Sequence, residues 1–245
     1  MTLSALLPAA GLFPLVLVLP AVLPRLRSCS LWWLPAACLP ALAAGLLLPD
    51  AAAVAWPNLY MGMAWQMDPA GRVFLLFSAV GWLTAGLFAL VYFQDRPRNA
   101  LFAVPFLMAM SGNFLLICAA DVVLFYTGFA LMGFASWGLI IHSATPEAFR
   151  AGRLYLLIVL LGESLVLPGI IATSLDAGSI DLQSLRLHLA AGTGENLWLL
   201  FLAVGFGLKA GLVPLHSWLP LAHPAAPSPA SAVLSGCMIK TGLLA

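Results

Sequence analysis

The sequence predicts an all-α integral membrane bundle of about eight transmembrane helices, with a break in the seventh helix. Hydrophobic residues make up 63% of the 245 residues and charged residues only 8%, and the mean hydropathy is +1.05. Soluble domains contain about 45–50% apolar and about 25% charged residues, so the composition excludes that class. A membrane-spanning helix needs about 20 apolar residues, and the chain has room for about eight such stretches.

The first three helices are expected to form an N-terminal part, residues 1–100, together with an outer loop. They are predicted at residues 3–23, 31–48 and 73–93. The first stretch lacks the basic start of a signal peptide, and its positive charges follow it, so we interpret it as an uncleaved helix. The residues between the second and third helices, among them Asp50, Pro57 and Asp68, predict a loop.

The other five helices are expected to form a second part, residues 101–245. They are predicted at residues 101–120, 122–142, 154–173 and 196–214, and from residue 230 onward. Ser111, Gly112 and Asn113 in the first of these favour close contact with another helix. Asp121 precedes the next helix, and a carboxylate is favourable at a helix N-terminus. The polar segment at residues 176–195 has a spacing of apolar residues that permits a short surface helix.

The arginines predict the orientation of the chain. The loops after helices one, three and five contain three pairs: Arg25 and Arg27, Arg96 and Arg98, Arg150 and Arg153. The loops after helices two, four and six contain only Arg72 and Arg186. Cytoplasmic loops carry the excess of positive residues, so we expect the N-terminus on the outside.

Two lysines lie within apolar sequence near the C-terminus. Lys209 precedes the proline-rich segment and Lys240 follows it. A lysine at the centre of a membrane helix costs roughly 2.5–3.5 kcal/mol, so it usually faces the bundle interior or a wet cavity and serves transport. Pro214 lacks a backbone donor and disfavours a continuous helix, and broken backbone at membrane depth lines protein or water. Alternatively, both lysines lie near helix ends and extend to the membrane surface.

The same segment closely resembles the signature of a known family. The similarity lies in GLKAGLVPLHSWLP at residues 207–220, AHPAAPSP at residues 222–229 and SGCMIKTG at residues 235–242. These residues resemble the antiporter-like membrane subunits of NADH-quinone oxidoreductase, Mrp-type antiporters, membrane-bound hydrogenases and formate hydrogenlyases. The segment HPAAPSPAS, residues 223–231, is most similar to the hydrogenase and formate hydrogenlyase branch of the family.

The resemblance implies a proton- or cation-translocating subunit built on inverted repeats of five helices. This chain resembles the leading helices and the first repeat, so a truncated, split or decayed gene product is expected, providing at most one half-channel. The resemblance also implies a short β-hairpin between helices two and three. Inverted repeats of this kind place a broken helix and its ionisable residue near the bilayer midplane.

The chain departs from the family at one acidic position. The resemblance implies a glutamate in helix five that pairs with the lysine of helix seven, but the matching residue is Ala130. Glu163 in helix six is the only deeply placed acid. We hypothesise that Glu163 supplies part of the counter-charge for Lys209, because a nearby ammonium keeps a buried carboxylate ionised. The alternative is a protonated Glu163 that forms a hydrogen bond within the bundle.

The other candidate residues extend a path for protons. Lys209 is expected to be the central carrier, and Pro214 marks the break in its helix. His216 could act as a relay, because a histidine both takes up and releases protons near neutral pH. Lys240 could pass the proton across the bundle, and His223 could line the place where protons enter from the cytoplasm. His142 and His188 receive no role.

No redox or metal site is expected within the chain. Its four cysteines are scattered, which favours packing roles over a disulfide framework or a metal centre, and a glycine-rich dinucleotide loop is absent. We therefore expect no cofactor here, and partner subunits that carry flavin, iron–sulfur or nickel–iron centres. The net charge of +1 gives no indication of nucleic-acid binding. The other expected partners are lipid and further membrane subunits, in a bacterial-type inner membrane.

Two alternatives to proton translocation remain from the residues. Ala130 favours a structural or assembly subunit that does not pump, whereas the presence of Lys209, His216 and Lys240 argues against it. The second alternative is an independent secondary transporter. The sequence lacks a set of polar residues large enough to bind a substrate, which argues against this alternative. The sequence does not decide between proton and sodium, or whether the chain is part of an enzyme complex.

Overall fold

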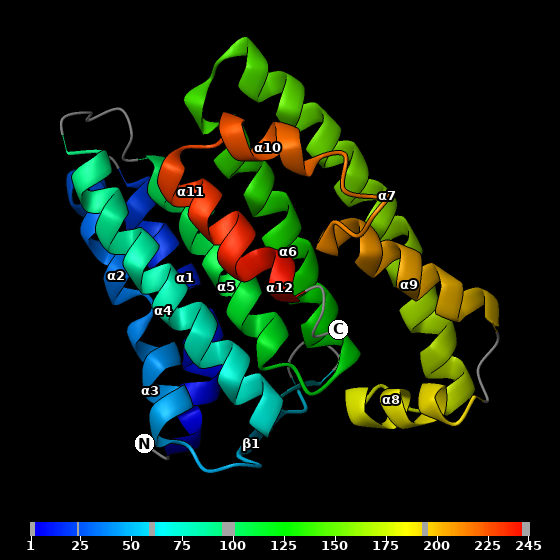
Figure 1. Ribbon diagram of the computed structural model, residues 1–245. Helices are drawn as coiled ribbons and strands as arrows, with labels where there is room; N and C mark the ends of the chain where they lie inside the picture. Colours follow the sequence, from blue (N-terminus) through cyan, green and yellow to red (C-terminus); the bar gives the residue numbers. More distant parts are fainter. Residues whose placement is uncertain (1–2, 24, 59–61, 95–100, 193–195, 242–245) are drawn as a thin grey trace.

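The computed structural model describes residues 3–23, 25–58, 62–94, 101–192 and 196–241. Within them the chain is mostly helical, and the long helices form a bundle (Figure 1). Five segments of the described chain are long and apolar enough to cross a membrane: Leu3–Val22, Cys29–Leu47, Pro69–Tyr92, Val122–Ser143 and Pro146–Ala177. Two apolar helices, Ala103–Ile117 and Asn196–Ala210, are shorter. The mostly helical, apolar architecture expected from the sequence is therefore present.

Helix α1 (Leu6–Val22) packs against α5 (Ala103–Ile117) and against α3 (Leu39–Leu47). The second predicted helix is divided, because a 3-10 turn at Arg27–Trp32 and the short helix α2 (Trp33–Ala36) precede α3. Pro35 and Pro40 lie in this divided segment, where proline removes backbone donors. Arg96 and Arg98, which contributed to the predicted orientation, lie outside the described residues.

A β-hairpin follows α3 and confirms the one that the family resemblance implied. Strands β1 (Ala53–Trp56) and β2 (Met63–Gln66) are antiparallel, with Ala53 opposite Gln66. The hairpin is joined to the connection between α5 and α6 (Val122–Ile140), because the amide of Ala120 donates to the carbonyl of Ala64 at 2.9 Å. Asp121 caps α6 as expected, accepting from the amide of Leu124 at 2.8 Å, and it also accepts from the amide of Ala64.

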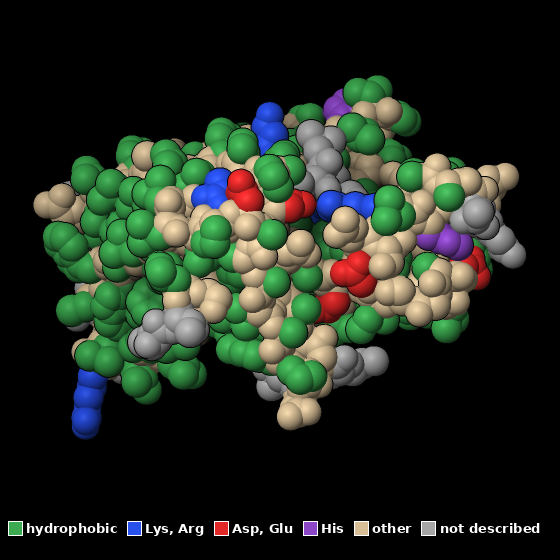
Figure 2. Space-filling view, turned by 90° about the horizontal axis from the view of Figure 1, so that it is seen from below, with side chains coloured by type: hydrophobic (Ala, Val, Ile, Leu, Met, Phe, Trp, Pro, Cys, Tyr) green, Lys and Arg blue, Asp and Glu red, His purple; other side chains and the backbone are tan. Residues whose placement is uncertain are grey.

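Charged side chains gather at the hairpin end of the bundle. Figure 2 shows this end, with acidic and basic side chains near its middle and many hydrophobic side chains around them. Arg72, in the first turns of α4 (Pro69–Tyr92), forms an ion pair of 3.0 Å with Asp50 and donates to the carbonyls of Gly45 and Leu48. These bonds satisfy acceptors that the end of a helix leaves unpaired. The arrangement is typical of a bundle end at the membrane surface.

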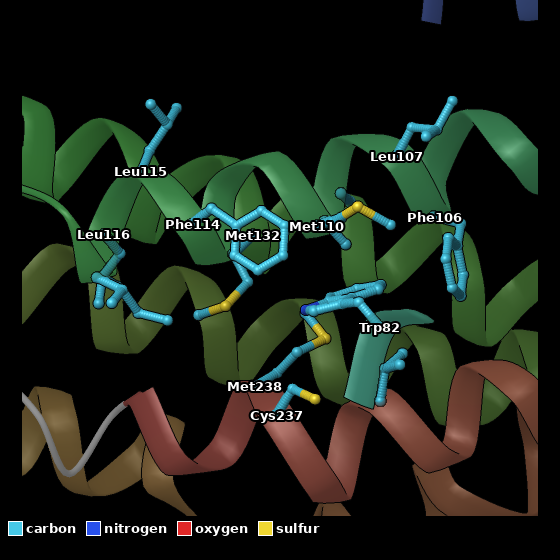
Figure 3. Close-up of a cluster of buried hydrophobic side chains, with 14 of the residues drawn as sticks. Trp82, Phe106, Leu107, Met110, Phe114, Leu115, Leu116, Met132, Cys237 and Met238 are labelled. Carbon is cyan, nitrogen blue, oxygen red and sulfur yellow. The ribbon is translucent and has the colours of Figure 1, made fainter. Parts of the chain in front are cut away.

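One part of the core lies around α5, where it faces α4 and α6. Trp82 of α4 is fully buried and its Nε1 donates to Oδ1 of Asn113 at 2.9 Å. Figure 3 shows Trp82 among the methionine, phenylalanine and leucine side chains of this cluster. A Cβ atom on Gly112 would lie 2.5 Å from the amide nitrogen of Met132, so α5 and α6 touch through their backbones. The predicted role of Gly112 in close helix contact is confirmed.

Helix α7 (Pro146–Ala177) has 32 residues and extends beyond both predicted ends. Thr145 caps its start by accepting from the amide of Ala148 at 3.1 Å, and Gly178 ends it in a left-handed conformation, which glycine adopts readily. Arg150 and Arg153 therefore lie in the first turns of α7 and not in a loop, which corrects their predicted place. The expected short surface helix follows as α8 (Leu182–Ala190).

Helix α9 (Asn196–Ala210) returns beside the second half of α7 (Figure 1). The contact is close, because a Cβ atom on Gly205 would lie 2.5 Å from Cγ2 of Val166 and 3.0 Å from the carbonyl oxygen of Gly162. Turns over residues 211–218 lead to α10 (Leu219–Ala225). The chain continues through α11 (Ser228–Val233), a π-helical turn at Leu234–Met238 and α12 (Ile239–Thr241).

Candidate functional site

Lys209 lies in the last turn of α9, where the helix ends four residues before Pro214. Gly211 has φ of +64°, and two hydrogen bonds close the helix around it: Leu212 N to the Gly207 carbonyl at 3.0 Å and Gly211 N to the Leu208 carbonyl at 3.3 Å. This is the pattern of a Schellman motif, which requires a left-handed residue that is usually glycine. Gly211 rather than Pro214 therefore ends the helix. A cation in the last turn also interacts favourably with the helix dipole.

The ammonium group of Lys209 has three partners. Its Nζ donates to the carbonyl oxygen of Phe129 at 2.9 Å, lies 4.0 Å from the centroid of the Phe129 ring, and lies 4.0 Å from Oε1 of Glu163. The two charged side chains are only 9% and 8% exposed. The proximity that we hypothesised between Glu163 and Lys209 is thus present, and it joins α6, α7 and α9 at one point.

Glu163 lies deep in the bundle. It is the eighteenth of the 32 residues of α7 (163 − 146 + 1), close to the middle of a helix that is longer than a membrane requires. Its Oε1 atom is buried and has no hydrogen-bond partner among the described residues. The hydroxyl group of Tyr126, on α6, interacts electrostatically with the carboxyl group. The carboxyl group therefore has an ammonium and a phenol among its polar neighbours.

A small cavity adjoins Lys209. Its volume is about 20 Å³ and its lining includes Lys209, Tyr155 and Trp218, which is enough for about one water molecule. The hydroxyl of Tyr155 donates to the carbonyl of Gly133 at 3.3 Å, and Nε1 of Trp218 donates to the carbonyl of Leu208 at 3.0 Å. These two bonds hold aromatic side chains around the space next to the ammonium.

The remaining predicted residues lie away from the pair. Pro214 and His216 are exposed in the turns that follow α9, and Lys240 is exposed on α12. Among the described residues, no hydrogen bond or ion pair joins His216 or Lys240 to Lys209. His223 is half-buried in α10, and its Nδ1 lies 2.9 Å from Oγ of Ser231. The structure therefore brings together Lys209 and Glu163 and leaves the others apart.

Three contributors to the site were not predicted. Phe129 acts through its backbone carbonyl and ring face, and Gly133 leaves the space that Nζ occupies, because a Cβ atom there would lie 2.6 Å from it. Tyr126 is one turn before Ala130 on α6, and residues four apart lie on one helix face. That spacing from the missing acid was the one signal in the sequence that could have indicated Tyr126. In the described part of the chain, no three His, Cys, Asp or Glu side chains gather as a metal site.

Comparisons with known proteins place these observations in a family. Residues 119–245 match the family described as "NADH:quinone oxidoreductase/Mrp antiporter, TM". Hydrogenase-4 component B of Escherichia coli (strain K12) is 34% identical over 190 residues, which are 76% of this chain and 28% of that protein. Formate hydrogenlyase subunit 3 of the same strain is 29% identical over 183 residues, 73% of this chain and 28% of that protein.

Two solved structures share the fold. A chain of the Mrp complex from Dietzia sp. DQ12-45-1b has a TM-score of 0.81 at 22% identity, over 100% of this chain and 48% of that one. A chain of the membrane-bound sulfane sulfur reductase, an archaeal respiratory membrane complex, has a TM-score of 0.75 at 21% identity, over 99% of this chain and 51% of that one. The chain thus spans less than a third of the two curated relatives and about half of the solved chains.

Proposed function

Because the chain belongs to the family of NADH:quinone oxidoreductase and Mrp antiporter membrane subunits, we propose that it translocates protons as a membrane subunit of a respiratory or hydrogenase-type complex. The observation that carries this proposal is the buried pair of Lys209 and Glu163, 4.0 Å apart near the middle of α7. Ionisable residues at membrane depth are costly and usually serve transport. The chain spans only part of the length of its relatives, so the proposal covers only the portion of a proton path that the residues of this chain can form.

The chemistry of the pair suits a proton carrier. A buried ammonium and a buried carboxylate each stabilise the charged state of the other, and separating them favours the neutral forms. A small movement of Lys209 between Glu163 and the Phe129 carbonyl would therefore let the lysine release a proton and later regain it. The cavity of about 20 Å³ next to Lys209 offers a place for the water that receives the proton.

The finer architecture is part of the same proposal. Counting the two shorter apolar helices and the segment α11–α12 with the five long spans gives eight transmembrane helices. We take α9, the turns at residues 211–218 and α10 as the broken seventh helix. Residues 1–100 would form the leading helices and residues 101–245 the first inverted repeat. The N-terminus would face outward in a bacterial-type inner membrane, as the arginine pairs predict.

The proposal also includes the outer residues of the proton path and the partner subunits. His216 and Lys240 would exchange protons with Lys209 through water, since no direct bond joins them among the described residues. His223, hydrogen-bonded with Ser231, would line the cytoplasmic access. Because the family's relatives include hydrogenase-4 and formate hydrogenlyase subunits, we expect further membrane subunits, and redox subunits with flavin, iron–sulfur or nickel–iron centres.

A subunit that does not pump is the second candidate, and Ala130 favours it. The side chain at this position of α6 carries no charge, so Lys209 has Glu163 as its one acidic partner among the described residues. In that case the pair would serve packing alone.

The substitution Lys209→Ala distinguishes the two candidates. We expect proton translocation by the assembled complex in native membrane vesicles to fall by at least about tenfold, as for other proton-transferring groups, and Glu163→Gln to have a similar effect. Arg153→Ala is the matched control, because it removes an exposed cation from α7 without touching the pair. Unchanged translocation with Lys209→Ala, at normal levels of the chain in the membrane, would leave the structural role.

A further inference from the structure

A pocket lies among the charged side chains at the hairpin end of the bundle. Its volume is about 370 Å³, within the range of about 300–1,000 Å³ that is usual for ligand sites in proteins. Its walls come from the segments before and after the hairpin, the end of α5, the start of α6 and the first turns of α8. Figure 2 shows acidic and basic side chains gathered at this end.

Hydrogen bonds fix the walls of this pocket relative to one another. The amide of Gln66 donates to the carbonyl of Cys118 at 2.9 Å, and the amide of Leu182 donates to the carbonyl of Ala120 at 2.9 Å. The hairpin, the connection between α5 and α6, and the start of α8 are thus joined through their backbones. A site that is formed before its ligand arrives loses less conformational freedom on binding, and this pocket has that property.

The charged groups of the pocket have opposite signs and come from different elements. Asp50 forms its ion pair with Arg72 at 3.0 Å, so a neighbour balances its charge. Oδ1 of Asp68, before α4, accepts from the amide of Gly71, and its Oδ2 accepts no hydrogen bond among the described residues. Arg186 brings a positive charge from α8. Beyond the Asp50–Arg72 pair, the lining thus presents one carboxylate and one guanidinium.

This combination favours a ligand that carries both charges. An anion at Arg186 would meet the carboxylate of Asp68, and a cation at Asp68 would meet the guanidinium, so a single charge gains on one side and loses on the other. A zwitterion satisfies both groups. Gln66 and Gln183 also line the pocket, and their amides can accept from an ammonium or donate to an anionic oxygen. The guanidinium of arginine suits a phosphate, because it offers paired N–H donors.

The position of the pocket indicates a lipid as the source of the zwitterion. Two helices of membrane length begin beside it, α4 at Pro69 and α6 at Val122. Leu116 and Phe125 give the lining an apolar part. The hydrocarbon core of a bilayer lies between the two ends of such helices, so a pocket at one end lies at the level of the lipid headgroups. A lipid there brings its headgroup to the charges and its chains to the apolar helices.

We propose that this pocket binds the headgroup of a phosphatidylethanolamine-type lipid. The ammonium group donates to Oδ2 of Asp68 and to the amide oxygen of Gln66, and a phosphate oxygen accepts from the guanidinium of Arg186. The bound headgroup joins α8 to the start of α4. Neither Lys209 nor Glu163 lines the pocket, so the inference does not rest on proton translocation.

Lipid retention tests the headgroup preference. The chain, with any partner subunits that accompany it, is placed in nanodiscs that contain equal amounts of palmitoyl-oleoyl phosphatidylethanolamine, phosphatidylglycerol and phosphatidylcholine. After transfer to detergent, native mass spectrometry counts the lipids that remain bound. We expect phosphatidylethanolamine to be retained about tenfold over the other two, the effect of one hydrogen bond to a charged group. Phosphatidylglycerol lacks the ammonium group, and the quaternary ammonium of phosphatidylcholine has no N–H to donate.

Two substitutions separate the roles of the two charges. Asp68→Asn keeps the cap of α4, because asparagine also accepts from helix amides, but it removes the negative charge. We expect it to abolish the preference for phosphatidylethanolamine without lowering the retention of phosphatidylglycerol. Arg186→Gln, at an exposed position of α8, should lower the retention of both lipids by about tenfold. Arg153→Gln is the matched control, since it removes an exposed arginine near the other end of the bundle.

Three results would overturn the inference. The first is equal retention of the three lipids by the wild-type chain. The second is an equal loss with Arg186→Gln and Arg153→Gln, which would mean that any surface arginine has the same effect. The third is displacement of the lipid by an equal concentration of soluble glycerophosphoethanolamine, which would make a free zwitterion the ligand. None of these results alters the outcome expected for Lys209→Ala, so the lipid site and the proposed function fail independently.

Discussion

A glycine makes room for the ammonium group of Lys209. The carbonyl of Phe129, which accepts from Nζ at 2.9 Å, is the group that the amide of Gly133 uses within an α-helix. The lysine can approach this carbonyl because residue 133 has no side chain. The ring of Phe129 adds an attraction of about 0.5–2 kcal/mol for a cation at this distance. The ammonium is therefore held by a backbone oxygen and a ring as well as by a carboxylate.

Gly133→Ala tests this arrangement. The added methyl group would lie 2.6 Å from Nζ and 3.3 Å from Oε1 of Glu163, so the ammonium must move away from the Phe129 carbonyl. We expect slower proton translocation with little loss of thermal stability, because the lysine end can shift and alanine favours a helix over glycine by about 1 kcal/mol. Gly236→Ala is the control, since nothing lies within 4 Å of its Cβ position. Wild-type rates with Gly133→Ala would contradict the need for this space.

At the scale of helices, glycines decide how closely the bundle packs. The backbones of α5 and α6 meet at Gly112 and Gly128, where a Cβ atom on Gly128 would lie 2.6 Å from the amide nitrogen of Leu116. Helices in membranes associate through such small residues, which allow backbones to approach. This contact fixes the face of α6 that carries Phe129 and Gly133.

Gly128→Ala should separate these two helices. Backbone atoms cannot move aside as a side chain can, so we expect a loss of about 1–3 kcal/mol, as for other overpacked sites. The measurement is thermal unfolding of the purified chain in detergent, with Gly236→Ala again as the control. Equal melting temperatures for the two variants would mean that the helices adjust without cost.

The elements differ in how far the sequence determined them. The long helices were predicted because their apolar stretches match the membrane thickness. Glu163 was predicted as the partner of Lys209 because few acids lie deep in this chain. The extension of α7 to Pro146 was missed, because it depends on the cap at Thr145. The end of α9 was placed at Pro214 instead of Ala210, since the left-handed Gly211 gives a weaker signal than proline.

The missed side chains have a common cause. Phe129 contributes a carbonyl group that every residue possesses, so no residue type reveals it. Tyr126 reaches Glu163 only because of the rotation of α6 against α7, which follows from packing between distant segments. Periodicity along one helix predicts a buried face, but it does not predict which residue of another helix that face will meet.

At the scale of the whole molecule, the two ends of the bundle carry different charges. Asp50, Asp68 and Arg186 line a pocket at the hairpin end, the end that faces the viewer in Figure 2, whereas Arg150 and Arg153 begin α7 at its other end. The positive-inside bias predicts that the second end faces the cytoplasm.

Cysteine labelling of intact cells tests this orientation. The background is Cys29→Ser, which removes the exposed native cysteine. An impermeant thiol reagent added outside should then label Asn58→Cys, which is exposed beside the hairpin. It should not label Ser143→Cys, which is exposed between α6 and α7. Permeabilised cells should label both, which controls for reactivity. The reverse pattern in intact cells would place the N-terminus inside.

The hydrogen bonds at the hairpin end also decide which part of the site can move. The amide of Val122 donates to the carbonyl of Ile180 at 3.0 Å and that of Leu182 to the carbonyl of Ala120 at 2.9 Å, so the start of α6 and the end of α7 are fastened together. Glu163 and Tyr126 thus lie on two helices that are joined at this end. Lys209 lies at the end of a helix that is followed by exposed turns. If the chain transports protons as proposed, Lys209 is therefore the group of the pair that we expect to move, and its movement would limit the rate of transport.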